Sequence, residues 1–237
     1  MTLATQEQQA APVRDRRSQR TRVALRDALA EEIYAAGDLS QVTVTAVTNR
    51  ADVTRRTFYS HYRDIADLVR SVEDEAIEEL RPYVNRVSET TLDQLEEAIG
   101  AFSPSPGSVE LLTHIKEHDG YLAALLGEGG DPSLSQRLCD MVCEQAHDRV
   151  SQGFIIPDAD VLIDYYLTFV ISAEVGVLVR WMTGGMKEPV EVISRMMTAL
   201  LFIRPGDLYG RPIGFDIPAT ASKFTAKREE ISDGPNR

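Results

Sequence analysis

Side chains that could hold a nucleic acid are concentrated in one short segment of this chain. Arginine carries a fork of N–H donors that matches the edge of guanine, and hydroxyl groups at the start of a helix suit phosphate oxygens. The donors and hydroxyls of the segment are Thr54, Arg55, Arg56, Thr57, Tyr59 and His61. Val53, Phe58 and Tyr62 recur at near-helical spacing and can pack the segment onto neighbouring helices. The pattern predicts a helix that packs with one face and presents the other to DNA.

Three helices are expected to position these side chains. The sequence predicts them at residues 18–36, 44–50 and 55–62. Thr43 and Thr54 suit the N-cap positions of the two shorter helices. We expect a tight turn between them at Asp52, because Asp tolerates the left-handed backbone conformation that such a turn needs better than most residues do. Two short helices after a longer one are typical of a helix-turn-helix, whose last helix enters the major groove.

The rest of the chain keeps the helical period. Further helices are expected at 64–87, 91–102, 107–118, 121–126, 133–152, 160–183 and 189–203. Gly and Pro punctuate the joints, and Pro82 is expected to kink or end the helix that contains it. We therefore predict an all-α fold, in which a helix-turn-helix DNA-binding domain precedes a helical ligand-binding and dimerisation domain. The predicted parts are a flexible Arg-containing arm at 1–17, the DNA-binding domain at 18–63, the second domain at 64–203 and a loose tail at 204–237.

The charge of the chain is unevenly distributed. Its 237 residues carry a formal net charge of -12, although a DNA-binding protein needs basic groups to neutralise phosphates. Residues 1–70 hold 11 arginines against 9 acidic residues, whereas the remainder holds 14 basic and 28 acidic residues. The acidity therefore belongs to the second domain. The arginines between positions 14 and 22 form either a solvated basic face or a DNA-binding arm.

Cysteine content and apolar segments bear on the location of the protein. Cys139 and Cys143 cannot support a disulfide-rich secreted fold, and their helical spacing fits a core position or a redox pair. No signal-peptide pattern opens the sequence. The apolar stretch 165–182 contains Glu174 and Arg180, which disfavours a membrane span. We expect a cytoplasmic protein with no membrane partner.

Two other classes of function are alternatives, an enzyme and a helical adaptor that binds protein through its acidic surface. Against catalysis, the sequence has no serine elbow, and its glycine-rich stretch 127–130 is acidic and lacks the lysine of a phosphate-binding loop. His114 and His118 have a spacing that could share a metal, but solvated or capping histidines explain it more simply. We predict that the chain is not an enzyme and holds neither a metal nor a cofactor.

Residues 53–62 resemble the signature of the TetR family of transcriptional regulators. The resemblance rests on Val-Thr-Arg-Arg-Thr-Phe-Tyr-Ser-His-Tyr in this segment, with Thr43-Val44 before it and Asp67-Leu68 after it. Residues 111–116 and 180–182 look more weakly like the C-terminal domain of some branches. Three positions depart from the family pattern. Asp38 and Asp52 stand where glycine is usual, and Ile65 stands where many members carry a phosphate-contacting lysine.

The resemblance implies a ligand-responsive repressor that binds a palindromic operator in double-stranded DNA as a homodimer. Matching positions imply DNA contacts by Arg55, Arg56, Thr57, Tyr59 and His61, with Thr45 and Thr54 near phosphates and Arg63 as a substitute for the missing lysine. The two arginines of the helix could contact bases or only phosphates, Tyr59 could instead be a core aromatic, and His61 a surface residue.

The family also implies that the last two long helices, 160–183 and 189–203, pair with their copies across a two-fold axis. Apolar groups surround much of the first of them, more than one core requires. We therefore expect a homodimer with recognition helices about 34 to 36 Å apart. An unidentified small-molecule effector would bind among aromatic and sulfur groups, which core packing explains equally well. These candidates are Phe102, Tyr121, Met141, Phe154 and Tyr165.

Overall fold

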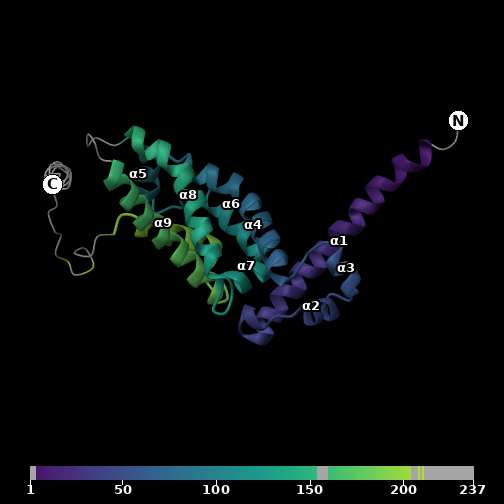
Figure 1. Ribbon diagram of the computed structural model, residues 1–237. Helices are drawn as coiled ribbons and strands as arrows, with labels where there is room; N and C mark the ends of the chain where they lie inside the picture. Colours follow the sequence, from purple (N-terminus) through teal and green to yellow (C-terminus); the bar gives the residue numbers. More distant parts are fainter. Residues whose placement is uncertain (1–3, 154–159, 204–207, 209, 211–237) are drawn as a thin grey trace, which may run out of the picture. The chain divides into compact units, whose positions relative to one another are not determined.

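The computed structural model describes residues 4–153, 160–203, 208 and 210, and the regular elements of these residues are helices. The helices are α1 (Ala4–Ala36), α2 (Val44–Arg50), α3 (Arg55–Tyr59), α4 (Ile65–Ser88), α5 (Leu92–Gly100), α6 (Ser108–Glu117), α7 (Asp119–Leu126), α8 (Pro132–Gly153), α9 (Asp160–Thr183) and α10 (Val190–Leu200), with a short 3-10 turn, η1 (Leu39–Gln41), after α1 (Figure 1). The all-α fold class predicted from the sequence is confirmed. The expected tail, 204–237, lies almost wholly outside the described residues.

Three helices differ in extent from the prediction. α1 begins at Ala4, so most of the segment expected as a flexible arm is helical, and its Ala, Gln, Glu and Arg residues are good helix formers. α3 ends at Tyr59, although the amides of His61 and Tyr62 still donate to the Phe58 carbonyl, each at 2.9 Å. α4 continues through Pro82. The proline removes one helical hydrogen bond, and the packing of the flanking turns can offset that loss.

The chain forms two compact units that interleave in sequence. The N-terminal unit contains the described chain up to Leu80, His114–Gln136 and Met182–Met186. The C-terminal unit contains Arg81–Thr113, the described residues from Arg137 to Trp181, and those from Lys187 onwards. The division differs from a sequential boundary after residue 63, because α7 and the first part of α4 pack with the N-terminal helices.

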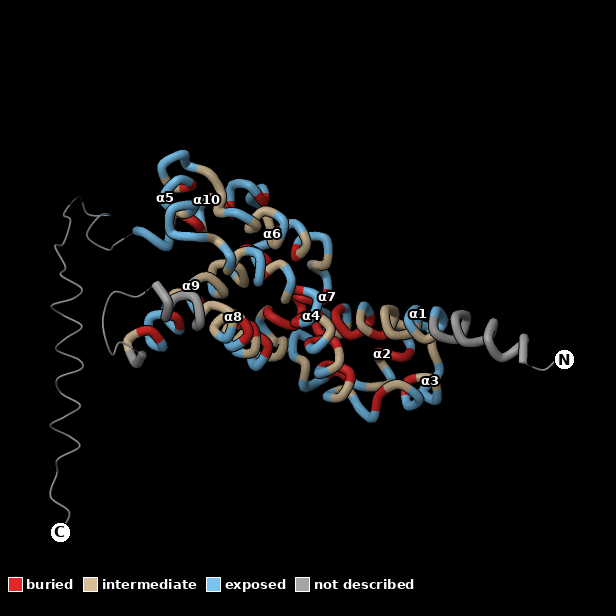
Figure 2. The backbone as a smooth tube through the Cα atoms, turned by 90° about the horizontal axis from the view of Figure 1, so that it is seen from above, coloured by how far each residue is buried: buried red, intermediate tan, exposed pale blue. Residues whose placement is uncertain are grey.

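The N-terminal unit is built around the inner face of α1. Leu25, Leu29 and Ile33 recur on that face and are buried, and α1 packs against both α7 and α2 (Figure 2). The other fully buried residues of this core include Val47 of α2, Phe58 of α3, Leu68 of α4 and Leu125 of α7. Each such side chain stabilises the fold by about 1.5 to 3 kcal/mol. This core fixes the two short helices of the helix-turn-helix on α1.

The C-terminal unit joins α8 to α9 and α5 to α10. Ile163, Leu167 and Ile171 of α9 pack against apolar residues of α8 that include Cys139 and Cys143. Burial raises the pKa of both thiols, which favours the core interpretation of this pair over the redox one. A hydroxyl contact of 2.5 Å between Ser108 and the buried Ser194 fixes α6 on α10. The unit therefore combines an apolar layer with a small polar contact.

Helix α9 has an unusually apolar surface. Among the described residues it is the one helix long and apolar enough to cross a membrane by length and composition, with a mean hydropathy of 1.7 over Leu162–Thr183. Only 17% of that window is buried inside the chain. Most of the apolar surface of α9 therefore has no cover within one copy of the described structure.

Candidate nucleic-acid interface

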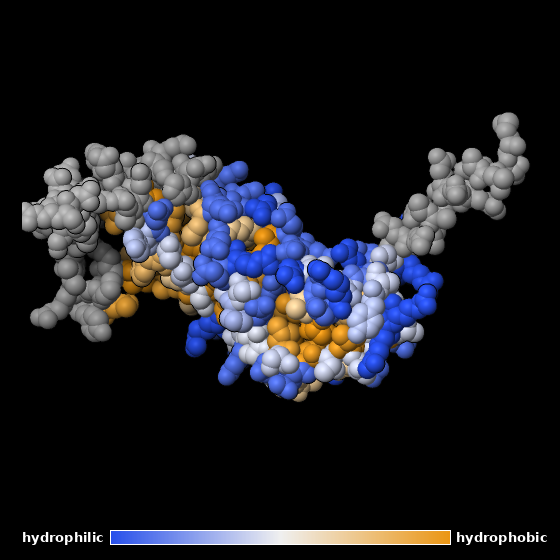
Figure 3. All heavy atoms as spheres, viewed as in Figure 1, coloured by the Kyte–Doolittle hydropathy of each residue, from blue (hydrophilic) through white to orange (hydrophobic). Residues whose placement is uncertain are grey.

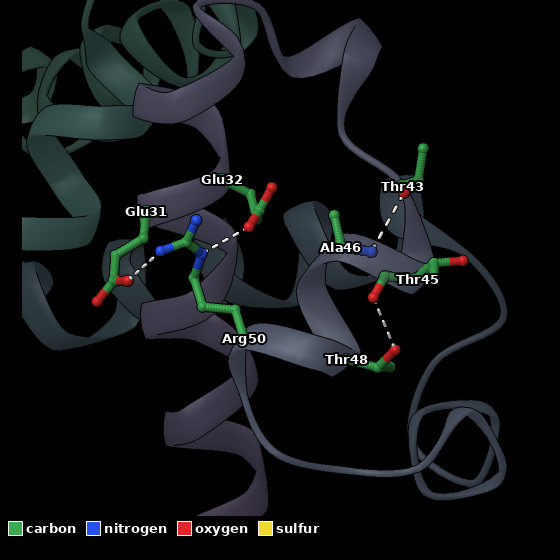
Figure 4. A network of polar contacts seen from close by, with 7 residues as sticks. All are labelled: Glu31, Glu32, Thr43, Thr45, Ala46, Thr48 and Arg50. Atoms are coloured by element: carbon green, nitrogen blue, oxygen red, sulfur yellow. Dashed lines mark hydrogen bonds and ion pairs between the residues drawn. The ribbon is translucent and has the colours of Figure 1, made fainter.

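Helix α2 is capped and anchored through polar contacts that are shown in Figure 4. The hydroxyl of Thr43 accepts a hydrogen bond from the Ala46 amide at 3.2 Å, which confirms the N-cap expected from the sequence. Arg50 at the other end donates to Glu32 at 2.5 Å and to Glu31 at 2.9 Å, both on α1. These hydrogen bonds raise the pKa of Arg50, with that to Glu32 contributing most. The two carboxylates therefore tie the C-terminal end of α2 to α1.

Asp38 and Asp52, which stand where glycine is usual, adopt different backbone conformations in their turns. Asp52 adopts φ +52°, the left-handed backbone expected for it, and the chain closes through a 3.0 Å bond from the Val53 amide to the Thr48 carbonyl. Asp38 is extended, and its carboxylate accepts from the Ser40 amide at 2.8 Å, which lowers its pKa. Gly37 takes the left-handed conformation in its place, with φ +73°.

Helix α3 is held by one buried face. The hydroxyl of Thr54 accepts from the Thr57 amide at 3.1 Å and so caps the helix as predicted. Phe58 is 0% exposed, and Tyr62 is buried beside it with ring centroids 5.8 Å apart. A five-residue helix is too short to be stable alone, so these two aromatic side chains fix it on the N-terminal core.

The opposite face of α3 presents polar side chains to solvent. Arg55 and Arg56 are exposed, and Tyr59 is 58% exposed, which excludes the core position considered for it. The guanidinium of Arg55 donates to the hydroxyl of Thr45 on α2, and Thr54 and Thr57 exchange a 2.9 Å hydrogen bond. The structure therefore brings residues of both short helices onto one polar surface.

The remaining two predicted contact residues follow α3. His61 is half-buried, with its ring 6.1 Å from that of Tyr62. Arg63 is exposed, its amide donates to Asp67 at 2.9 Å, and its guanidinium lies 3.2 Å from the same carboxylate. The Arg63 amide and side chain lower the pKa of Asp67. An exposed pair of this kind contributes only about 0 to 1 kcal/mol, so Arg63 can exchange Asp67 for a phosphate at small cost.

Asp64 and Asp67 only partly form a capping box at the start of α4. Asp64 accepts from the Asp67 amide at 2.8 Å, as such a box requires. The carboxylate of Asp67 instead accepts from the Arg63 amide, one residue before the Asp64 amide that a full capping box would use. A shorter side chain than Glu accounts for the different reach, and the contact fixes Arg63 next to α3.

A polar network behind α3 was not predicted from the sequence. Arg22 of α1 donates to the Tyr62 hydroxyl, which is the main cause of its raised pKa, and pairs with Glu75 at 3.2 Å. Arg26, one turn later, lies 4.4 Å from the centre of the Tyr121 ring, whose hydroxyl donates to Glu79 at 3.3 Å. The sequence signal that could have indicated this network is the pair Arg22 and Arg26, which lie four residues apart on one face of α1.

The five residues proposed as an effector pocket differ in their surroundings. Tyr121 is buried in the N-terminal unit, where burial raises its pKa to about 12, and Met141 is buried in the C-terminal unit. Phe102 is 71% exposed and Tyr165 is 73% exposed, so neither lines an internal cavity of the described chain. Phe154 lies outside the described residues. Aromatic content alone did not distinguish pocket, core and surface positions.

The two histidines considered as metal ligands stack on each other. Their ring centroids are 4.3 Å apart, and Nδ1 of His118 lies 2.8 Å from the His114 carbonyl oxygen. Burial, followed by the proximity of His118, lowers the pKa of His114. The described residues contain no cluster of three or more His, Cys, Asp or Glu side chains arranged to hold a metal ion.

Comparison with known proteins places these features in one family. A TetR-type family model described as "Transcriptional regulator C-terminal region" matches residues 103–202. An "Uncharacterized HTH-type transcriptional regulator YxbF" of Bacillus subtilis (strain 168) is 22% identical over 193 residues, which are 80% of this chain and 47% of that protein. The chain therefore spans about half the length of that curated relative.

A solved structure of similar fold matches most of the chain. It is a TetR transcriptional regulator from Streptococcus agalactiae 2603V, which is 25% identical, matches 81% of this chain and 98% of its own length, and superposes with a TM-score of 0.51. An N-terminal helix-turn-helix followed by a helical region is common to both. The chain is therefore similar to TetR-type transcriptional regulators in sequence and in fold.

Proposed function

We propose that this TetR-type regulator is a cytoplasmic, non-enzymatic repressor that binds a palindromic operator as a homodimer and is released by a small-molecule effector. The observation that carries the DNA-binding part is the exposed face of α3. Arg55, Arg56 and Tyr59 reach solvent there, on a helix that Phe58 and Tyr62 hold from the other side. A helix fixed in this way can enter the major groove without having to fold first.

The contacts proposed for this face divide by the type of group. Arg56 and Tyr59 are assigned to base edges in the groove. Among the ion pairs found for the described residues, none joins Arg56 to a carboxylate, so no ion pair has to break when it binds DNA. Thr45 and Thr54, near the starts of α2 and α3, are assigned to phosphates together with Arg55. Thr57, His61 and Arg63 flank this set and complete the proposed interface.

The dimer is proposed on the apolar faces of α9 and α10. Tyr165 and Phe169, four residues apart on α9, are each 73% exposed, and Val192, Met196 and Leu200 repeat the same spacing on α10. Hydrophobic residues reach the surface over α9 in Figure 3. Large exposed apolar surfaces of this kind mark contacts with another protein or a membrane. A second copy would cover both stripes at once through a two-fold contact, as in a bundle of four helices.

Repression and release are linked through this dimer. Both recognition helices fit one operator only if their separation matches successive major grooves, about 34 to 36 Å. An effector that binds better to a dimer with a different separation would therefore favour dissociation from DNA. The fraction of operator bound by the protein then falls as the effector concentration rises.

The test is a selection of bound duplexes by the full-length chain from a random-sequence library, followed by sequencing. The proposal predicts an inverted repeat whose half-sites are centred about 10 to 10.5 base pairs apart, or a multiple of it. A protein that enriches no sequence, or enriches one without two-fold symmetry, would contradict the proposal. The same purified protein should sediment as a dimer.

A further inference from the structure

The arginines of the N-terminal unit differ in whether a carboxylate already neutralises them. Those paired with an acidic side chain are Arg22 with Glu75, Arg26 with Asp27, Arg50 with Glu31 and Glu32, and Arg63 with Asp67. Arg16, Arg17 and Arg20 of α1 are exposed. Among the contacts found for the described residues, none pairs these three guanidinium groups with an acid. Their charge is therefore available to another molecule.

These three arginines lie on α1 within two helical turns before Arg22, whose guanidinium donates to the Tyr62 hydroxyl just after α3. Arg17 is one helical turn before Thr21 and lies on the side of α1 that continues through Ala28 to Glu31 and Glu32. Those two glutamates contact Arg50, so this side of α1 faces α2. Arg17 therefore lies on the helix-turn-helix side of α1.

Arg20 is the neighbour of Arg17 on this part of the helix. With Arg16, Gln19, Val23 and Ala24 it lines a shallow, open hollow on the surface of α1. The acidic residue of that hollow, Asp27, is already engaged by Arg26 at 3.1 Å. Neither Arg17 nor Arg20 would have to give up an ion pair in order to contact a new anion.

Electrostatics favours DNA as that anion. The whole chain has a net charge of -12, so it repels a polyanion at long range, and an attractive surface must come from local unpaired cations. A guanidinium that already has a carboxylate partner adds little net attraction to a phosphate, whereas an unpaired one adds a full charge. Duplex DNA carries about one negative charge per 1.7 Å of its axis, so phosphates flank any groove that α3 enters.

We propose that Arg17 and Arg20 form a second DNA-contacting surface, on α1, that binds backbone phosphates beside the groove occupied by α3. This inference rests on the proposed function, because it assumes that α3 binds DNA. It assigns the sequence-independent part of the binding to α1 and leaves base recognition to α3.

The test measures the salt dependence of binding to a random-sequence duplex by fluorescence anisotropy, with the full-length chain. The double variant Arg17→Gln/Arg20→Gln is compared with wild type, with the charge-matched control Arg86→Gln/Lys187→Gln, whose exposed side chains lie in the C-terminal unit, and with Arg17→Lys/Arg20→Lys. Each lost phosphate contact lowers the slope of log K against log salt by about 0.9, so the Gln double variant should lose about 2 per protomer. The control and the Lys variant should keep the wild-type slope.

The outcomes separate this inference from the proposed function. If wild type binds and the Gln variant has the same slope, the α1 surface is wrong while DNA binding by α3 stands. If the control loses as much slope as the Gln variant, the effect is one of net charge and the α1 surface is again wrong. If wild type does not bind the duplex even at low salt, both proposals fail. Circular dichroism of each variant checks that α1 remains helical, and a slope that the Gln variant loses and the Lys variant keeps supports a charge contact.

Discussion

Phe58 and Tyr59 are neighbours in α3 with opposite surroundings, and replacing each by alanine tests how the recognition helix is held. Phe58 is 0% exposed, so Phe58→Ala removes a buried ring and leaves a cavity, at a cost of about 3 to 5 kcal/mol in the free energy of unfolding. Tyr59 is 58% exposed, and its ring meets that of Phe58 edge-on at 5.5 Å. Tyr59→Ala should therefore cost only about 0.5 to 1.5 kcal/mol.

The assay is urea unfolding of both variants, followed by far-UV circular dichroism, with DNA binding measured on the same samples. The reasoning predicts that Phe58→Ala unfolds at clearly lower urea, whereas Tyr59→Ala keeps a nearly wild-type midpoint but binds DNA more weakly. Equal losses of stability would refute the account of one buried and one exposed face. A Tyr59→Ala variant with wild-type stability and wild-type affinity would place Tyr59 outside the interface.

Two further predictions concern the C-terminal unit. Phe169→Asp on α9 or Met196→Asp on α10 should raise the dimer dissociation constant roughly 100-fold without unfolding the chain, because each places a carboxylate in the proposed apolar contact; a dimer that persists in sedimentation would argue against this interface. Burial raises the pKa of Glu174 to about 7 from its ordinary 4.5, so the stability linked to its protonation is fully present below pH 4.5 and is lost as pH rises through 7. Glu174→Gln should therefore be more stable than wild type at about pH 8, by on the order of 1 to 3 kcal/mol, with the difference shrinking towards low pH in urea titrations. A pH-independent difference would contradict this reasoning.

Local features of the helix-turn-helix could be predicted from the sequence because each depends on residues close together in the chain. The caps at Thr43 and Thr54 need only a hydroxyl three residues before the amide that it accepts from, and both form as expected. Asp52 adopts the left-handed turn that its short polar side chain tolerates. The burial of Phe58 and Tyr62 follows from helical spacing.

Contacts between helices could not be predicted in the same way. Which carboxylate meets Arg50, or which ring lies under Arg26, depends on how α1 crosses α2 and α7, and these partners are many residues away in sequence. The surroundings of Tyr121 could not be predicted for the same reason. An aromatic residue of this type suits a ligand pocket, but Tyr121 packs under Arg26 of another helix. The extent of α1 is a different case, because an alanine- and arginine-rich segment without apolar periodicity still has high helix propensity.

The most direct test of the central claim is a binding titration of Arg56→Ala against the operator enriched by wild type. Arg56 is exposed on α3 and is assigned to a base edge. The account predicts a loss of about 1 to 3 kcal/mol in binding free energy, with altered preference at one base pair of each half-site. An unchanged operator affinity would contradict the claim that this face of α3 reads the DNA.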